Sequence, residues 1–200
     1  MKTVTGLFDD YSDASAAVNA LEASGVPSND ISIVSNNADN RYDGDSNAAE
    51  GAGTGAGIGA ALGGVGGLLT GLGIMAIPGV GPVVAAGWLA ATAAGAVAGA
   101  VAGGAAGGLI GALTDSGIPE DHAHVYAEGV RRGGTLVTAK VDDAKVTAAE
   151  AILKRSSWVD PAERGAAYRA DGWTKFDDTL DPYDQQQVVQ ERDRYRRAGL

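Results

Sequence analysis

The sequence predicts an α+β protein whose body is a ferredoxin-like pair of β-α-β repeats, interrupted by a long Gly/Ala-rich helical hairpin and followed by a helical tail. Three observations predict this fold. Strand-like alternation followed by helical spacing occurs at the start of the chain and again in its second half. An uncharged glycine-rich stretch separates the two occurrences. The chain ends in a polar segment that becomes rich in arginine.

Residues 1–35 make the first half of the predicted body. Apolar or β-branched residues alternate with small ones over 3–8, and residues 10–24 carry apolar side chains near helical spacing. Gly25 ends that helix. Alternation returns over 30–35, which completes a β-α-β unit.

Residues 117–160 repeat this order after the insertion. A helix is predicted over 119–132, a strand over 135–141, a second helix over 144–155 and a closing strand over 158–160. Two β-α-β units of this size predict a small antiparallel sheet with two helices on one face, which is the ferredoxin-like sandwich.

The insertion begins with a polar linker, residues 36–50, and continues as the stretch 51–114, which carries no charged residue and holds most of the 31 glycines. Prolines and glycines at 77–82 mark a turn. The sequence therefore predicts two helices, over 54–76 and 83–113, joined as a hairpin.

Glycine or alanine recurs at every fourth position of both predicted helices. Four residues advance about 400°, so each row forms a continuous groove in which a neighbouring backbone can approach closely. Small residues lie on several sides of the second helix, which suits it better to contact with other helices than with lipid alone. The sequence predicts self-association through these glycines: Gly55, Gly59, Gly63, Gly67, Gly71, Gly87, Gly95, Gly99, Gly103, Gly107 and Gly111.

Two environments for the hairpin stay open. Each predicted helix is long enough to cross a hydrocarbon core of about 30 Å, which suits contact with membrane lipid. Several copies packed into the dry core of a soluble homo-oligomer would bury the same surfaces. A flexible linker is the weaker interpretation, because linkers lack four-residue periodicity. The N-terminus lacks the charged and apolar regions of an export signal, so we expect a cytoplasmic body, alone or held at the inner membrane by the hairpin.

Composition excludes several function classes. The chain has 25 acidic and 15 basic residues, a net charge of -10, which argues against nucleic-acid binding because phosphate neutralisation needs a surplus of Lys and Arg. It has no cysteine, which excludes disulfides and thiolate sites. The two histidines, His122 and His124, point about 200° apart on a helix and cannot share a metal from it.

Two local motifs resemble known binding sites, but each departs from the pattern that its site requires. Residues 39–50 nearly match a calcium-binding EF-hand loop, but Arg41 occupies a ligand position. Residues 55–60 resemble a dinucleotide-binding glycine loop, but they lie inside the glycine repeat, well beyond the nearest predicted strand. The acidic pairs at 9–10 and 142–143 are interpreted as charges at helix starts. We expect no catalytic residue, no metal site, no cofactor and no enzymatic activity.

The tail, residues 161–200, is polar with scattered aromatic residues and is interpreted as a docking segment with a terminal helix. Its basic residues could contact anionic lipid, contact an acidic neighbouring subunit, or lie on a solvated helix beside compensating acids. These residues are Arg192, Arg194, Arg196 and Arg197.

Residues 117–138, GIPEDHAHVYAEGVRRGGTLVT, resemble the corresponding block of bacterial general stress proteins of the heat-induced stress protein family. The Asp-Pro-Tyr sequence at 181–183, with the Arg-rich helix after it, is similar to longer proteobacterial members. The resemblance implies a stress-associated, non-enzymatic structural protein and transfers no catalytic residue. A soluble regulatory module that binds a small ligand or a protein partner on its sheet stays open as the alternative.

Overall fold

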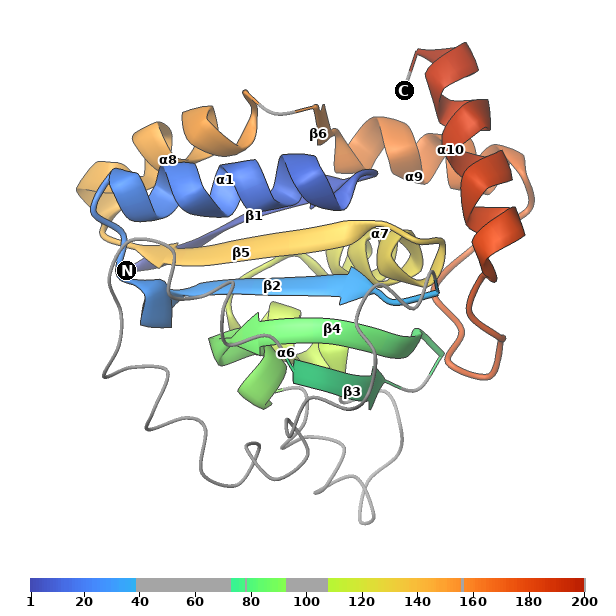
Figure 1. Ribbon diagram of the computed structural model, residues 1–200, viewed down its shortest axis with the longest axis horizontal. Helices are drawn as coiled ribbons and strands as arrows, with labels where there is room; N and C mark the ends of the chain where they lie inside the picture. The colour runs from blue at the N-terminus through green and yellow to red at the C-terminus, as the bar shows by residue number, and fades with distance from the viewer. Residues whose placement is uncertain (39–72, 78, 93–107, 156, 200) are drawn as a thin grey trace.

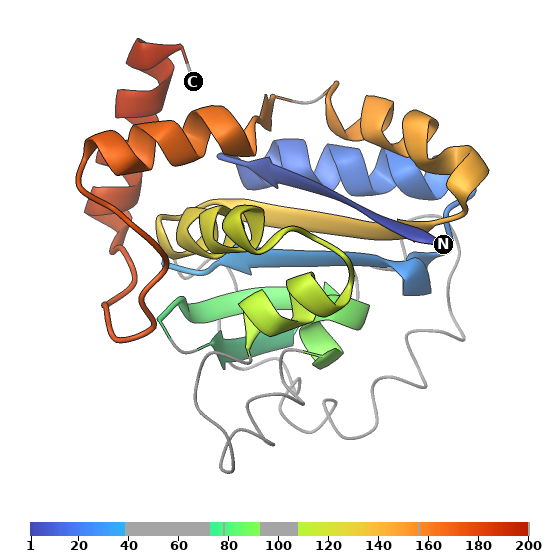
Figure 2. The same ribbon diagram turned by 180° about the vertical axis from the view of Figure 1, so that it is seen from behind.

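The computed structural model describes residues 1–38, 73–77, 79–92, 108–155 and 157–199. They form a six-stranded sheet in the order β3-β4-β2-β5-β1-β6, and every pair of neighbouring strands in it is antiparallel. Helices lie on both faces of the sheet (Figures 1 and 2). This confirms the predicted α+β class.

The strands are β1 (Lys2–Phe8), β2 (Ile31–Asn36), β3 (Gly73–Ile77), β4 (Gly81–Gly87), β5 (Thr135–Val141) and β6 (Trp158–Val159). The main helices are α1 (Tyr11–Ala23), α6 (Leu109–Asp115), α7 (Glu120–Arg131), α8 (Val146–Leu153), α9 (Pro161–Ala170) and α10 (Gln185–Ala198).

The strands of the two predicted β-α-β repeats lie next to one another as β2-β5-β1-β6. β5 occupies the centre, where Thr138 is opposite both Thr5 of β1 and Ser32 of β2. The two repeats are therefore interleaved: β5 of the second repeat lies between β1 and β2 of the first, and β1 lies between β5 and β6 of the second. Helices α1 and α8 cover one face, with Val18, Leu21, Leu153 and the inward residues of β1 and β5 in one apolar cluster.

The second face is also covered, which differs from the expected sandwich with helices on one side only. Helix α7 lies across it, with Ala123, Tyr126 and Val130 packed towards the sheet. Gly129 permits this close approach, because a Cβ placed on it would lie 2.5 Å from a methyl carbon of Leu7. The insertion and the tail supply the remaining layers on this side.

The predicted helical hairpin is wrong where the structure describes it. Residues 73–77 and 81–87 are strands β3 and β4, and helix is found only at 88–92 and 109–115 of that segment. β4 finds a partner in β2, with Val34 opposite Ala85. Each interior glycine costs a helix about 1 kcal/mol, whereas Gly73, Gly81 and Gly87 stand at the ends of the strands, where glycine disturbs the pairing less. Residues 51–72 and 93–107 lie outside the described residues.

The turn between the two predicted arms is confirmed, but it joins strands. Gly79 and Gly81 have φ values of +72° and +87°, a conformation that side chains with a Cβ rarely adopt. Val80 between them is fully buried in the second-face cluster. The Pro/Gly cluster at 77–82 therefore closes a β-hairpin.

Candidate functional site

Two of the glycines predicted for self-association, Gly87 and Gly111, lie within the described residues. Gly87 ends β4 opposite Ser32, with φ +90°, and an added Cβ would lie 2.1 Å from the carbonyl oxygen of Ile31. Strand pairing inside one chain therefore requires glycine at this position. Gly111 lies on α6 and is partly exposed. The remaining predicted residues lie outside the described part: Gly55, Gly59, Gly63, Gly67, Gly71, Gly95, Gly99, Gly103 and Gly107.

Strand β3 is an edge of the sheet. It pairs with β4 from Gly73, opposite Ala85, to Ile77, opposite Gly81, and no other described strand flanks it. Its sequence, Gly-Ile-Met-Ala-Ile, has neither a charge nor a proline. Lys, Glu and Pro are the residues that commonly protect sheet edges from pairing with another chain.

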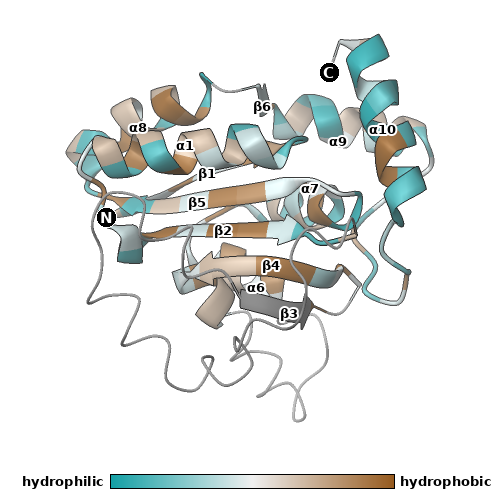
Figure 3. Ribbon diagram, in the orientation of Figure 1, coloured by the Kyte–Doolittle hydropathy of each residue, from teal (hydrophilic) through white to brown (hydrophobic). Residues whose placement is uncertain are grey.

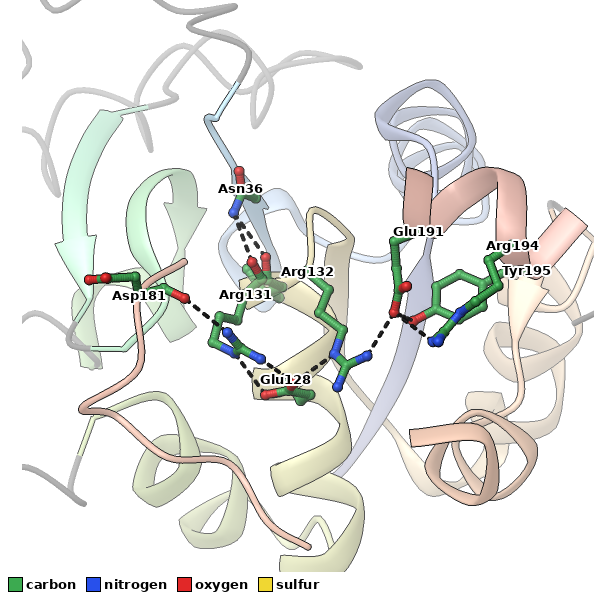
Figure 4. Close-up of polar contacts among 9 residues, drawn as sticks. Asn36, Glu128, Arg131, Arg132, Asp181, Glu191, Arg194 and Tyr195 are labelled. Atoms are coloured by element: carbon green, nitrogen blue, oxygen red, sulfur yellow. Dashed lines mark hydrogen bonds and ion pairs between the residues drawn. The ribbon is translucent and has the colours of Figure 1, made fainter. Parts of the chain in front are cut away.

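The tail docks on the body through a buried ionic network (Figure 4). Glu128 of α7 is fully buried, and its carboxylate accepts two hydrogen bonds from Arg131, of 2.6 and 2.9 Å, and one of 2.6 Å from Nε of Arg132. Arg132 then donates from Nη1 to Glu191 of α10 at 2.7 Å. Burial alone lowers the pKa values of both arginines, but the hydrogen bonds and the charges of the carboxylates together outweigh it, so the pKa values are raised and both side chains stay charged inside the protein.

Glu191 is the second centre of the network. Besides Arg132 it accepts hydrogen bonds from Arg194, at 2.9 Å, and from the hydroxyl of Tyr195. Burial and the Glu191 carboxylate raise the pKa of Tyr195. Helix α10 is mostly hydrophilic (Figure 3), so charge pairing, more than apolar burial, fixes its position.

A second ion pair joins the tail to the turn after β1. Arg164 of α9 is almost fully buried and donates from its two terminal nitrogens to the two carboxylate oxygens of Asp9, at 2.7 and 2.8 Å. Its guanidinium carbon lies 3.6 Å from the ring centroid of Tyr195. Tyr168, fully buried beside it, packs edge-on against Trp173. Helices α9 and α10 are thereby fixed to each other and to the body.

The loop between α9 and α10 reaches the insertion. A Cβ on Gly79 would lie 2.3 Å from the Cα of Asp178, and one on Gly81 would lie 2.5 Å from the ring of Pro182. The carbonyl of Asp181 accepts a hydrogen bond of 2.9 Å from Arg131. The tail therefore contacts the β3–β4 turn, α7 and the start of α1 together.

Three of the four basic residues of α10 pair with acids of the same chain, and Arg197 donates to the backbone carbonyl of Asp193 at 3.1 Å. Arg192 and Arg196 both lie near the Asp10 carboxylate, at 3.5 and 3.4 Å, and Arg194 forms an ion pair with Asp171. Sequence reasoning left lipid, a neighbouring subunit and solvent open for these residues. The compensating acids on the helix are confirmed, since Arg194 pairs with Glu191 and Arg196 with Asp193. Sequence reasoning missed Asp10 and Asp171, because these partners are distant in sequence and charge alone does not identify them.

The acidic pairs lie at helix starts, as predicted, since Asp10 precedes α1 and Asp142 precedes the 3-10 turn Asp143–Lys145, but their side chains also make contacts that the sequence does not predict. The Asp10 side chain makes no capping hydrogen bond on α1. Asp9 binds Arg164 instead. Asp143 lies 3.6 Å from the N-terminal amino group. The calcium-like loop at 39–50 and the dinucleotide-like loop at 55–60 lie outside the described residues.

A groove lies beside β1, with a volume of about 390 Å³. Tyr126 faces it, and burial, with a smaller effect of the Asp160 carboxylate, raises the pKa of the phenol and keeps it protonated. His122 packs edge-on to the Tyr126 ring, whereas His124 lies 3.7 Å from Glu120. The residues that line the groove are Thr3, Val4, Thr5, Ile118, Pro119, His122, Tyr126, Glu150, Leu153, Lys154, Trp158, Asp160, Pro161 and Ala162.

Metal chemistry and membrane spanning find no support in the part of the chain that the structure describes. No group of three His, Asp or Glu side chains gathers there in a way that could hold a metal ion. Among the same residues, no helix has both the length and the apolar character that crossing a bilayer requires.

Comparison with known proteins agrees with the resemblance noted in the sequence. No curated protein and no solved structure matches the chain. Residues 3–80, which run from β1 to the β3–β4 turn, match the model of the heat induced stress protein YflT domain. That match confirms the expected relationship and supports a stress-associated role. Residues 3–80 are therefore similar to the heat-induced domain of bacterial general stress proteins.

Proposed function

We propose that this is a non-enzymatic, stress-associated structural protein that binds copies of itself through the uncharged segment, residues 51–114. The observation that carries the proposal is β3, an edge strand inside that segment without a charge or a proline. An apolar strand edge offers its N–H and C=O groups to another chain. The glycine rows of the same segment favour self-association independently.

The contact we propose is antiparallel pairing of β3 with β3 of a second copy across a twofold axis. A twofold contact uses one surface twice and closes on itself, which gives a dimer and not a filament. The glycine rows outside the described residues would then join such dimers, in a soluble assembly or at a membrane. Net charge disfavours nucleic acid as a partner.

The test is the particle mass of the full chain, measured by sedimentation velocity for the native protein and for Met75→Lys. The lysine puts a charge into the middle of β3 and should lower the mass by at least a factor of two. Val189→Lys is the matched control, because Val189 is an exposed apolar residue of α10 and its variant should keep the native mass. Equal masses for all three proteins would refute pairing through β3.

The role of the glycine rows needs a separate variant. Replacing Gly63, Gly67, Gly99 and Gly103 together by leucine should reduce the assembly to the β3-paired dimer. Fractionating native lysate with and without detergent distinguishes the environments, because a membrane-inserted segment pellets until detergent is added. A native protein that is monomeric in both conditions contradicts self-association altogether.

The alternative function, a regulatory module that binds a ligand or a protein partner on its sheet, is favoured by the groove beside β1. Its volume lies within the range of about 300–1,000 Å³ that is typical of ligand sites. The two functions use opposite edges of the sheet, so they can be tested separately.

A further inference from the structure

Strand β1 has an open edge over its first half. It pairs with β5 along its whole length, but with β6 only at Leu7 and Phe8. The Trp158 side chain lies against Gly6, where an added Cβ would be 3.3 Å from the indole Cδ1. On that side, no described strand faces Thr3, Val4 or Thr5. Alternate residues of this stretch therefore turn their N–H and C=O groups away from the sheet.

The chain itself cannot extend β6 along this edge. Asp160 follows β6 and accepts hydrogen bonds from the backbone N–H groups of Ala162, at 2.7 Å, and Glu163, at 3.2 Å. It thereby caps α9, and Pro161 at the first helical position has no N–H to offer a ladder. The two-residue strand β6 therefore ends where the groove begins.

Helices from both faces of the sheet form the walls of this groove. Leu153 and Lys154, at the end of α8, stand on one side, and His122 and Tyr126 of α7 stand on the other. Figure 2 shows β1 running towards the N-terminus between α8 and the layer of α7 and α6. Thr5 forms part of the floor, and its buried hydroxyl has no hydrogen-bond partner among the described residues.

We propose that the groove binds an extended polypeptide segment, which adds to the sheet as a strand beside β1 and in line with β6. A strand edge is satisfied by another backbone, which distinguishes this site from a pocket that recognises only side chains. A second folded copy cannot supply its own β1, because that strand lies between the same helices. The occupant is therefore an extended segment without attached layers.

The two walls set the side chains that this segment presents. Val4 faces the α8 side, where Leu153 and Trp158 are apolar. Thr3 and Thr5 face the α7 side, near His122. Because successive residues of a strand point to opposite faces, the occupant alternates apolar and hydrogen-bonding residues.

The charges that line the groove further restrict which segments can bind. Two carboxylates, Glu150 and Asp160, and one ammonium, Lys154, line the groove, and the whole chain carries a net charge of -10. A segment with basic ends is attracted to this surface, whereas an acidic one is repelled.

The probe is a capped, fluorescently labelled heptapeptide in which valine and threonine alternate between terminal lysines. We expect it to bind the full-length protein with micromolar affinity, measured by anisotropy, and to slow hydrogen exchange at the Thr3 or Thr5 amide. Two further peptides carry N-methyl groups on alternate residues, one in each parity. Strand addition predicts that one parity weakens binding by about tenfold or more and that the other does not.

The protein variants address the place of binding. Ala162→Trp fills the rim of the groove from an exposed position and should weaken binding by about tenfold. Ala166→Trp, one turn further along α9 and also exposed, does not line the groove and should bind as the native protein does. Equal binding by both variants, equal effects of both methylation parities, or no binding at millimolar concentration would overturn the proposal. None of these outcomes depends on β3 or on self-association.

Discussion

Arg164 holds both oxygens of the Asp9 carboxylate, at 2.7 and 2.8 Å, while the ring of Tyr195 covers its guanidinium carbon at 3.6 Å. Arg164 of α9 thus connects the turn after β1 to α10, the last helix of the chain. The planar guanidinium provides this geometry, because it donates two parallel hydrogen bonds and stacks on an aromatic face at once.

Replacing Arg164 by lysine should therefore not be conservative. An ammonium keeps the charge but loses the paired hydrogen bonds and the stacking on Tyr195, and we expect unfolding free energy to fall by about 2 kcal/mol. Urea denaturation followed by circular dichroism measures this. Arg169→Lys, at an exposed position of the same helix, is the control and should change the value by less than about 0.5 kcal/mol. Equal losses in the two variants would contradict the role given to Arg164.

Glu128→Gln tests the buried network around α7. The amide cannot compensate the buried charge of Arg131, and Arg132 keeps only Glu191 as its anion, so we expect a loss of about 3–5 kcal/mol. Glu163→Gln, on the exposed side of α9, should leave stability nearly unchanged. A loss below about 1 kcal/mol for Glu128→Gln in denaturant titrations would show that the network does not hold its charges as the geometry indicates.

Gly133→Ala tests the close contact between Gly133 and α10. Gly133 has φ +100°, and an added Cβ would lie 2.4 Å from a methyl carbon of Val188. Backbone strain of about 1–2 kcal/mol and a clash of about 1–3 kcal/mol should add, and limited proteolysis should release the tail. Gly172→Ala has similar strain, at φ +88°, but no atom within 4 Å of the added carbon. The difference between the two melting curves isolates the clash, and identical curves would mean that α10 does not rest on Gly133.

Alkaline pH should unfold the protein through its buried tyrosines. Burial raises the pKa of Tyr168 from 10.0 to about 12, so the folded state keeps a proton that the unfolded state releases first. This contribution, roughly 3 kcal/mol, is complete below pH 10 and disappears as pH rises from about 10 to 12. Denaturant titrations at pH 9 and pH 11.5 should show the loss, and Tyr168→Phe should reduce it. An unchanged pH dependence in that variant would assign the effect to other groups.

The class of the fold is predictable because its strongest signals are local. Alternation over 3–8 and 135–141 and the helical spacing of Val18 and Leu21 each arise from neighbours in sequence, and the structure buries the apolar residues among them in the two clusters on either face of the sheet. The turn at 77–82 is predictable for the same reason, since proline and glycine act on their own backbone.

Strands β3 and β4 cannot be predicted from local sequence signals. Val83 to Ala86 form a continuous small apolar run, and such runs occur equally in buried strands and buried helices. The four-residue glycine repeat favours a helix, and only the presence of β2 as a partner decides for a strand. Gly87 shows the ambiguity, since the same residue serves a helix groove in one interpretation and a close strand pair in the other.

The ionic network of the tail cannot be predicted from spacing. Arg164 lies 155 positions from Asp9, and Arg132 lies 59 positions from Glu191. Charged residues that distant have no periodic relationship to detect, and a surface charge resembles a buried one in sequence. The Arg-rich end of α10 and its neighbouring acids are visible as a pattern, but the distant partners Asp10 and Asp171 depend on how α9 turns the chain.

The central place of β5 has a consequence for how the chain is made. β2 can pair with β4 as soon as residue 87 has been made, but β1 pairs only with β5 and β6, so β1 has no strand partner until Thr135–Val141 have been synthesised. At about 5–20 residues per second, that interval lasts roughly 7–27 s. During it the nascent chain carries an unpaired strand and the uncharged segment together, which makes elongation the period in which association with other chains competes most directly with folding.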